Sequence, residues 1–111
     1  MPPVTLFAAL ADQSRCRVLE LLRERARPVH ELAAELNISR PAISRHLRVL
    51  KEAGLVREEK HGRENVYTLE SQQLLGADHW LEAFRAAPRA EKRTRPAPPS
   101  HASLDLFSFG G

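Results

Sequence analysis

The sequence predicts a mainly α-helical fold with one small β-hairpin, and three observations support this. Apolar residues recur at helical spacing through most of residues 5–53, with proline or glycine between the stretches. Two short stretches, 55–60 and 65–69, flank a turn that contains Gly62, which is typical of paired strands. A last stretch of helical spacing covers 71–87. The expected order is four helices, two strands and a final helix, which is a winged helix-turn-helix.

Three helices are expected before residue 37. The stretch 5–10 stops before Asp12, whose side chain is suited to cap a second helix running to about Arg25. Pro28 is expected to break the chain there because proline cannot continue a helix. A third helix is indicated by the i, i+3, i+4, i+7 spacing of Val29, Leu32, Ala33 and Leu36.

The fourth helix, 39–53, has the clearest start. Ser39 is a typical N-cap, and Pro41 falls in the first turn, where its missing amide costs nothing. The helix is expected to end before Gly54. Its inward stripe is Ile43, Leu47 and Leu50.

The outer positions of the helix 39–53 carry positive or polar side chains, and no acidic residue occurs before Glu52. A helix fits the major groove of DNA, where Arg, Ser and His side chains can reach base edges. A solvated basic face on a structural helix is the alternative. The DNA-contacting residues expected here are Ser39, Arg40, Ser44, Arg45, His46, Arg48 and Lys51.

The hairpin tip adds a further candidate contact. Arg63 follows Gly62 in the turn, where it is placed to reach the DNA backbone or the adjacent minor groove. The neighbouring acids Glu58, Glu59 and Glu64 weaken the positive field at this tip, so a merely solvated turn is the alternative.

Composition narrows the class of protein. The 111 residues have a net charge of +3, which favours a polyanionic partner without identifying DNA. The single cysteine, Cys16, excludes an intrachain disulfide, and it is expected to be a small core residue rather than a redox sensor. No secretion signal, membrane-spanning run, catalytic set or cofactor motif is found, so we expect a cytoplasmic protein that is not an enzyme and has no cofactor.

Several segments together closely resemble the ArsR family of winged-helix repressors, over about residues 5 to 85. The matching segments are Ala9-Leu10-Ala11-Asp12-Gln13-Ser14-Arg15, Glu31-Leu32-Ala33, Ser39-Arg40-Pro41-Ala42-Ile43-Ser44-Arg45-His46-Leu47-Arg48-Val49-Leu50 and Ala53-Gly54-Leu55-Val56. The resemblance implies a homodimer, paired through its first and last helices, that binds a roughly two-fold operator in double-stranded DNA. The implied interface residues are Leu6, Phe7, Trp80, Leu81 and Phe84, with plain core residues of a monomer as the alternative.

The metal sites of this family are not reproduced. The positions that align with its Cys-x-Cys are Pro28 and His30. Near the family's second site, Asp78, His79 and Glu82 share the last helix, but the spacing differs and no second histidine follows. We therefore expect no metal, with a metal- or thiol-responsive sensor as the alternative.

The predicted domain, for DNA binding and dimerisation, covers 1–87. Residues 88–111 form a basic, Pro-rich tail that is expected to be flexible and that ends in the apolar segment Leu104–Phe109. This segment is expected to fold back on the domain or its partner. It also resembles, weakly, the short peptides that dock on the bacterial sliding clamp, so protein docking through the tail is a further possible function.

Overall fold

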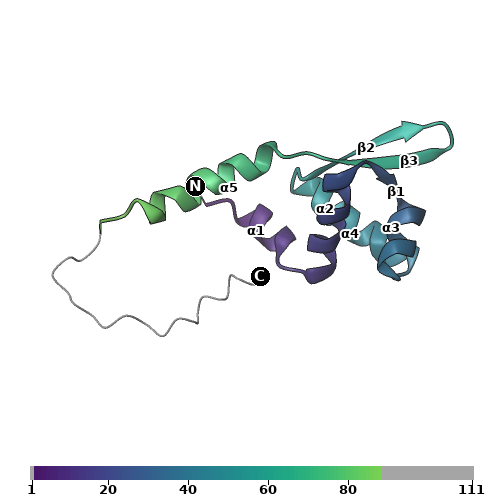
Figure 1. Cartoon of the computed structure of the whole chain (residues 1–111), viewed down its shortest axis with the longest axis horizontal. Helices are drawn as coiled ribbons and strands as arrows, with labels where there is room; N and C mark the ends of the chain where they lie inside the picture. The colour runs from purple at the N-terminus through teal and green to yellow at the C-terminus, as the bar shows by residue number, and fades with distance from the viewer. Residues whose placement is uncertain (1, 89–111) are drawn as a thin grey trace.

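The computed structural model describes residues 2–88, which form five helices and a three-stranded antiparallel sheet (Figure 1). The mainly helical winged architecture expected from the sequence is confirmed. All of the predicted tail except Pro88 lies outside the described residues. The helices are α1 (Val4–Leu10), α2 (Gln13–Glu24), α3 (Val29–Leu36), α4 (Arg40–Glu52) and α5 (Gln72–Arg85). The strands are β1 (Arg27–Pro28), β2 (Val56–His61) and β3 (Glu64–Leu69), in the order β1-β3-β2.

The helix boundaries follow the local signals of the sequence. The Asp12 carboxylate accepts a hydrogen bond from the Arg15 amide at 3.0 Å and caps α2. The Ser39 hydroxyl accepts one from the Ala42 amide at 3.3 Å and caps α4, with Pro41 in the first turn. Between α3 and α4, Asn37 adopts a left-handed conformation with φ of 55°, which ends α3 and allows the short turn of the pair.

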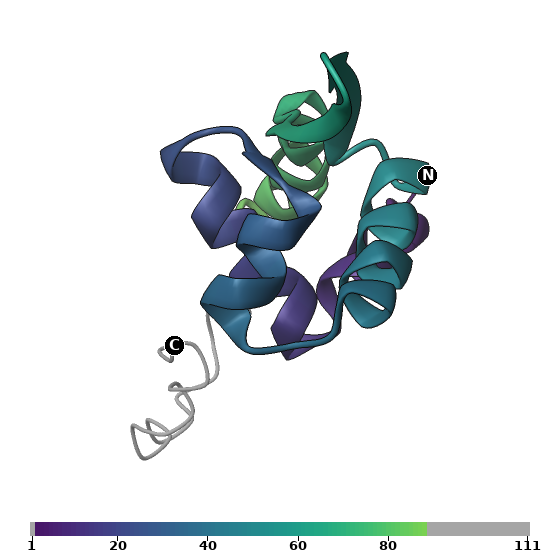
Figure 2. The same cartoon turned by 90° about the vertical axis from the view of Figure 1, so that its right-hand side faces the viewer.

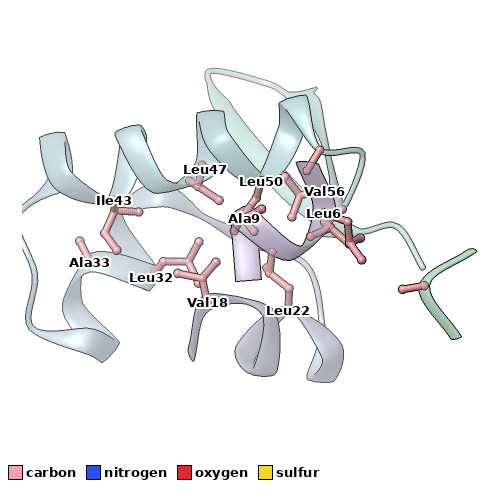
Figure 3. Packing of buried hydrophobic residues seen from close by; sticks show 13 residues of the cluster. Leu6, Ala9, Val18, Leu22, Leu32, Ala33, Ile43, Leu47, Leu50 and Val56 are labelled. Atoms are coloured by element: carbon pink, nitrogen blue, oxygen red, sulfur yellow. The ribbon is translucent and has the colours of Figure 1, made fainter. Parts of the chain in front are cut away.

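The core lies between α1, α2, α3 and α4 (Figure 3). Ile43, Leu47 and Leu50 of α4 are at most 1% exposed and face Leu32 of α3 and Val18 of α2. Because these three residues recur every three or four positions, they bury one side of α4 along its length.

The last helix has a different environment. The observed bounds of α5 agree with the expected 71–87 to within one residue at the start and two at the end. Ala77 is its only buried residue. The helix contacts α1 and extends from the body of the molecule (Figure 1). Large apolar side chains on α5 consequently stay exposed, including Leu75 at 67% and Phe84 at 60%.

The sheet contains one strand that the sequence did not predict. Pro28 was expected only to break the chain between two helices, but with Arg27 it forms β1. This strand pairs antiparallel with β3, placing Arg27 opposite Tyr67 and Pro28 opposite Val66. Proline is tolerated there because β1 is an edge strand, where one missing amide leaves the other pairings intact.

Arg27 holds this edge strand in place. Its side chain is only 7% exposed, and it forms ion pairs with Glu24 at 2.8 Å and Glu31 at 3.3 Å. Its Nε also donates to the Leu21 carbonyl at 3.2 Å. A buried guanidinium needs such partners because removing it from water is costly.

We predict that Arg27→Ala lowers the free energy of unfolding by about 2 kcal/mol, because it removes hydrogen bonds to charged groups and leaves a void. Arg25→Ala is the control. Arg25 also pairs with Glu31, but its side chain is 58% exposed, so its loss should cost less than about 1 kcal/mol. Urea unfolding of both variants checks this, and equal losses would contradict the role given to Arg27.

Candidate DNA-binding surface

The helix α4 lies along one flank of the helical body (Figure 2). Since its apolar side faces the core, its remaining side faces solvent. Six of the seven residues expected to contact DNA from this helix are exposed, whereas His46 is partly buried. The exposed six are Ser39, Arg40, Ser44, Arg45, Arg48 and Lys51.

The charges on this surface differ in availability. Within residues 2–88, Arg40, Arg45 and Arg48 form no ion pair. Lys51, near the end of the helix, pairs with Glu58 of β2 at 2.9 Å. The three arginines thus present donors to any anion that approaches, whereas Lys51 must first exchange a partner.

Lys51 and Glu58 also connect the end of α4 to the hairpin. The hydrogen bond from Lys51 lowers the pKa of Glu58 below its usual range. Glu58 lies opposite Tyr67 on β3. Burial of the phenol, together with the neighbouring Glu58 carboxylate, raises the pKa of Tyr67 to about 12.

Arg63 is exposed at the hairpin tip, beside Gly62, whose φ of 66° forms the turn. The acids expected to oppose a DNA contact here all have cationic or histidine neighbours. Glu59 lies within 3.3 Å of both Arg57 and His61, and Glu64 lies 3.9 Å from His30. Glu58 has Lys51. Because Lys51 and Arg57 compensate part of the negative charge of Glu58 and Glu59, these two acids weaken the field at Arg63 less than the sequence suggested.

His46 faces into the body of the molecule. Its Nδ1 lies 3.4 Å from a guanidinium nitrogen of Arg15 and 4.0 Å from the Asp12 carboxylate. Sequence reasoning assigned Asp12 only a capping role and gave Arg15 none. The contact joins residues 31 positions apart, so no local spacing indicates it.

A second surface forms where α1 meets α5. Trp80 packs between Phe7 and Phe84, with ring centroids 5.6 Å and 4.6 Å apart respectively. Phe84 is 60% exposed and Leu81 42%. Leu6, however, is only 4% exposed and belongs to the core of its own chain, so it has little surface to offer a partner.

Within residues 2–88, histidines and acids meet only in pairs, such as His46 with Asp12 and His61 with Glu59. No group of three or more His, Cys, Asp or Glu side chains within residues 2–88 is arranged to hold a metal ion. On α5, Asp78 and Glu82 instead lie beside Arg85.

Cys16 is partly buried as a free thiol, with Sγ 3.2 Å from the Leu10 carbonyl. None of the helices in residues 2–88 has the length and hydropathy required to cross a bilayer.

Residues 12–58, from the α2 cap into β2, match the family model described as bacterial regulatory protein, arsR family. The transcriptional repressor SdpR of Bacillus subtilis is 32% identical over 71% of this chain and 88% of its own length. The chain belongs to the ArsR family. It is also 44% identical to the repressor SmtB of Mycobacterium tuberculosis, over 68% of this chain and 51% of SmtB. The chain therefore spans only about half the length of SmtB.

Solved structures agree with this assignment to the ArsR family. An ArsR-like transcriptional regulator from Rhodococcus sp. RHA1 has a TM-score of 0.70 and 36% identity, covering 76% of this chain and 79% of that protein. The family model is described as a bacterial regulatory protein, and SmtB, SdpR and the Rhodococcus protein are named as transcriptional repressors or regulators rather than as enzymes.

The raised pKa of Tyr67 predicts a loss of stability at high pH. The pKa of Tyr67 in the folded protein, about 12, lies above the usual 10.0, so folding favours the protonated phenol. The resulting contribution to the free energy of unfolding is complete below pH 10 and is lost as the pH rises towards 12. Tyr67 is the only tyrosine among the 111 residues, so its phenolate absorbance reports it alone.

Glu58→Gln should move that absorbance midpoint down, while burial keeps it above 10. Glu59→Gln, at a wing acid that pairs with Arg57 and His61, is the control and should leave the midpoint in place. The assignment fails if both variants shift it equally.

Proposed function

We propose that this ArsR-family chain is a homodimeric repressor that binds a two-fold operator in double-stranded DNA through α4. The observation that carries the proposal is the row of exposed arginines, free of ion pairs within residues 2–88, on a helix whose opposite side is locked into the core. A side chain can read a base edge reproducibly only if its backbone is held rigidly.

The residues divide by their place on the helix. Those near the start of α4 address base edges in the major groove, because this end of a reading helix points into the groove. Those further along contact phosphates, and Arg63 of the wing contacts the neighbouring backbone. The groove residues are Ser39, Arg40, Ser44 and Arg45, and the phosphate residues are Arg48 and Lys51.

The α1–α5 surface supports pairing of two copies. Exposed aromatic and leucine side chains gather there, and burying them between copies would be favourable by about 25 cal/mol per Å². A two-fold dimer presents two reading helices to one face of the duplex, about one helical turn apart. Phe7, Trp80, Leu81 and Phe84 form this surface, and Leu6 supports it from within the core.

The relatives support repression as the outcome, since SmtB and SdpR are named as repressors. A bound dimer would exclude other proteins from the operator. This activity would take place in the cytoplasm, where bacterial DNA is located.

Selecting bound sites from random double-stranded DNA with the purified chain tests the proposal. We expect an enriched site with two inverted half-sites about one helical turn apart. Enrichment without symmetry would contradict the dimer, and failure to enrich any sequence would contradict specific binding.

On the selected site, Arg45→Ala should lower affinity about tenfold or more while changing affinity for random DNA much less, because a base contact is lost. Lys51→Ala should weaken both alike and reduce the salt slope by about one, because a phosphate contact is lost. Binding titrations at several salt concentrations measure both effects. Identical behaviour of the two variants would refute the division between base and phosphate contacts.

Phe84→Glu should convert the dimer to monomers, because it places a charge within the apolar surface. Since Phe84 is 60% exposed, the fold of each chain should survive. His79→Glu is the control, on an exposed position about 140° around the same helix from Phe84. Sedimentation equilibrium checks the prediction. A Phe84→Glu protein that remains dimeric would contradict an interface at the α1–α5 surface.

A further inference from the structure

The Arg15 guanidinium joins three helices. From its place in the first turn of α2, its Nε donates to the Ala9 carbonyl at 2.7 Å and one terminal nitrogen donates to the Ala8 carbonyl at 3.3 Å. These carbonyls lie in the last turn of α1, where helix carbonyls lose their regular partners, and the Ala8 carbonyl also accepts the amide of the C-cap Ala11 at 3.2 Å. The other terminal nitrogen lies 3.4 Å from Nδ1 of His46, in the middle of α4.

The chemistry of this contact sets what it requires of the imidazole. A guanidinium has donors only, so a hydrogen bond from Arg15 to Nδ1 of His46 requires the tautomer whose ring proton is on Nε2. The Asp12 carboxylate lies 4.0 Å from the same Nδ1 and accepts the Arg15 amide, which lowers the pKa of Asp12. Asp12 and Arg15 are the charged groups that lie within 4.0 Å of the ring. The α1 carbonyls contact Arg15 and not the ring itself.

The planar fork of Arg15 suits this task. Its nitrogens point in fixed directions and reach the end of α1 and His46 together, which a lysine ammonium on a flexible stem would not reproduce. The helix α1 also carries Phe7, which packs on Trp80 of α5. A continuous chain of contacts therefore runs from the α1–α5 surface through Arg15 to the reading helix.

We propose that Arg15 is a positioning residue for DNA reading, which holds His46 and the end of α1 together and so sets the orientation of α4. In this arrangement His46 acts through Arg15 rather than by touching a base. A shift of α1 on α5 is passed to α4 through the same guanidinium. The inference rests on the proposed function, since it concerns how the same helix reads its operator.

A double-mutant cycle tests this on the selected operator and on random DNA. Arg15→Lys keeps the positive charge but loses the fork, and His46→Leu keeps the bulk but loses the acceptor. Each should lower operator affinity about tenfold with little change on random DNA, and the double variant should bind no more weakly than the weaker single variant. His46→Gln, which retains an acceptor oxygen, should restore most of the operator affinity.

Arg17→Lys is the matched control. It makes the same substitution on the same helix, at a side chain that is 55% exposed and pairs only with Glu20 among residues 2–88. It should leave operator affinity unchanged. Full operator affinity in Arg15→Lys, or losses that multiply in the double variant, would overturn the proposal. If Arg15→Lys does not fold, the proposal is tested by the two His46 variants alone. Equal losses of operator affinity in His46→Leu and His46→Gln would overturn it.

A measurement without DNA separates this inference from the proposed function. In the free protein, Arg15→Lys should shift the amide resonances of α4 around His46, and Arg17→Lys should not. Unchanged α4 resonances would overturn the positioning role even if wild-type protein selects an operator. Shifted resonances in a protein that selects no operator would instead refute the proposed function while leaving the link between Arg15 and α4 in place.

Discussion

The rest of the structure depends on the burial of one side of α4. Ile43, Leu47 and Leu50 are almost fully removed from water against α2 and α3 (Figure 3). Because this contact extends along the whole helix, it prevents α4 from rolling and leaves its basic side in solvent. Core packing and a DNA-binding surface are therefore two consequences of the same periodic sequence.

Polar contacts add to this packing at two points of α4. Near its middle, His46 meets Arg15, and near its end, Lys51 meets Glu58 of the hairpin. Each contact joins α4 to an element that bears on another surface, α1 in the first case and the wing in the second. Apolar packing permits small sliding movements, whereas hydrogen bonds between fixed atoms are directional. The polar contacts thus define the orientation of α4 more narrowly than the core alone.

Unlike the core, the apolar surface of α1 and α5 is only partly buried. Its aromatic rings pack on one another, yet Phe84 and Leu81 remain substantially exposed. A small domain with a single core has little stability to spare, so further burial on this surface would contribute to stability as well as to assembly. Through its contacts with Ala9 of α1 and His46 of α4, Arg15 connects the α1–α5 surface to the DNA-binding surface.

The sequence by itself determined the helices, the hairpin and the sign of the charge on α4. These features depend on residues a few positions apart, such as the caps Asp12 and Ser39, and such spacing is visible without a fold. Only the tertiary structure decided that Arg27 and Pro28 form a strand, that Leu6 is enclosed and that His46 faces Arg15. These outcomes depend on contacts between residues distant in the chain, and chain packing, which local spacing does not encode, brings such residues together.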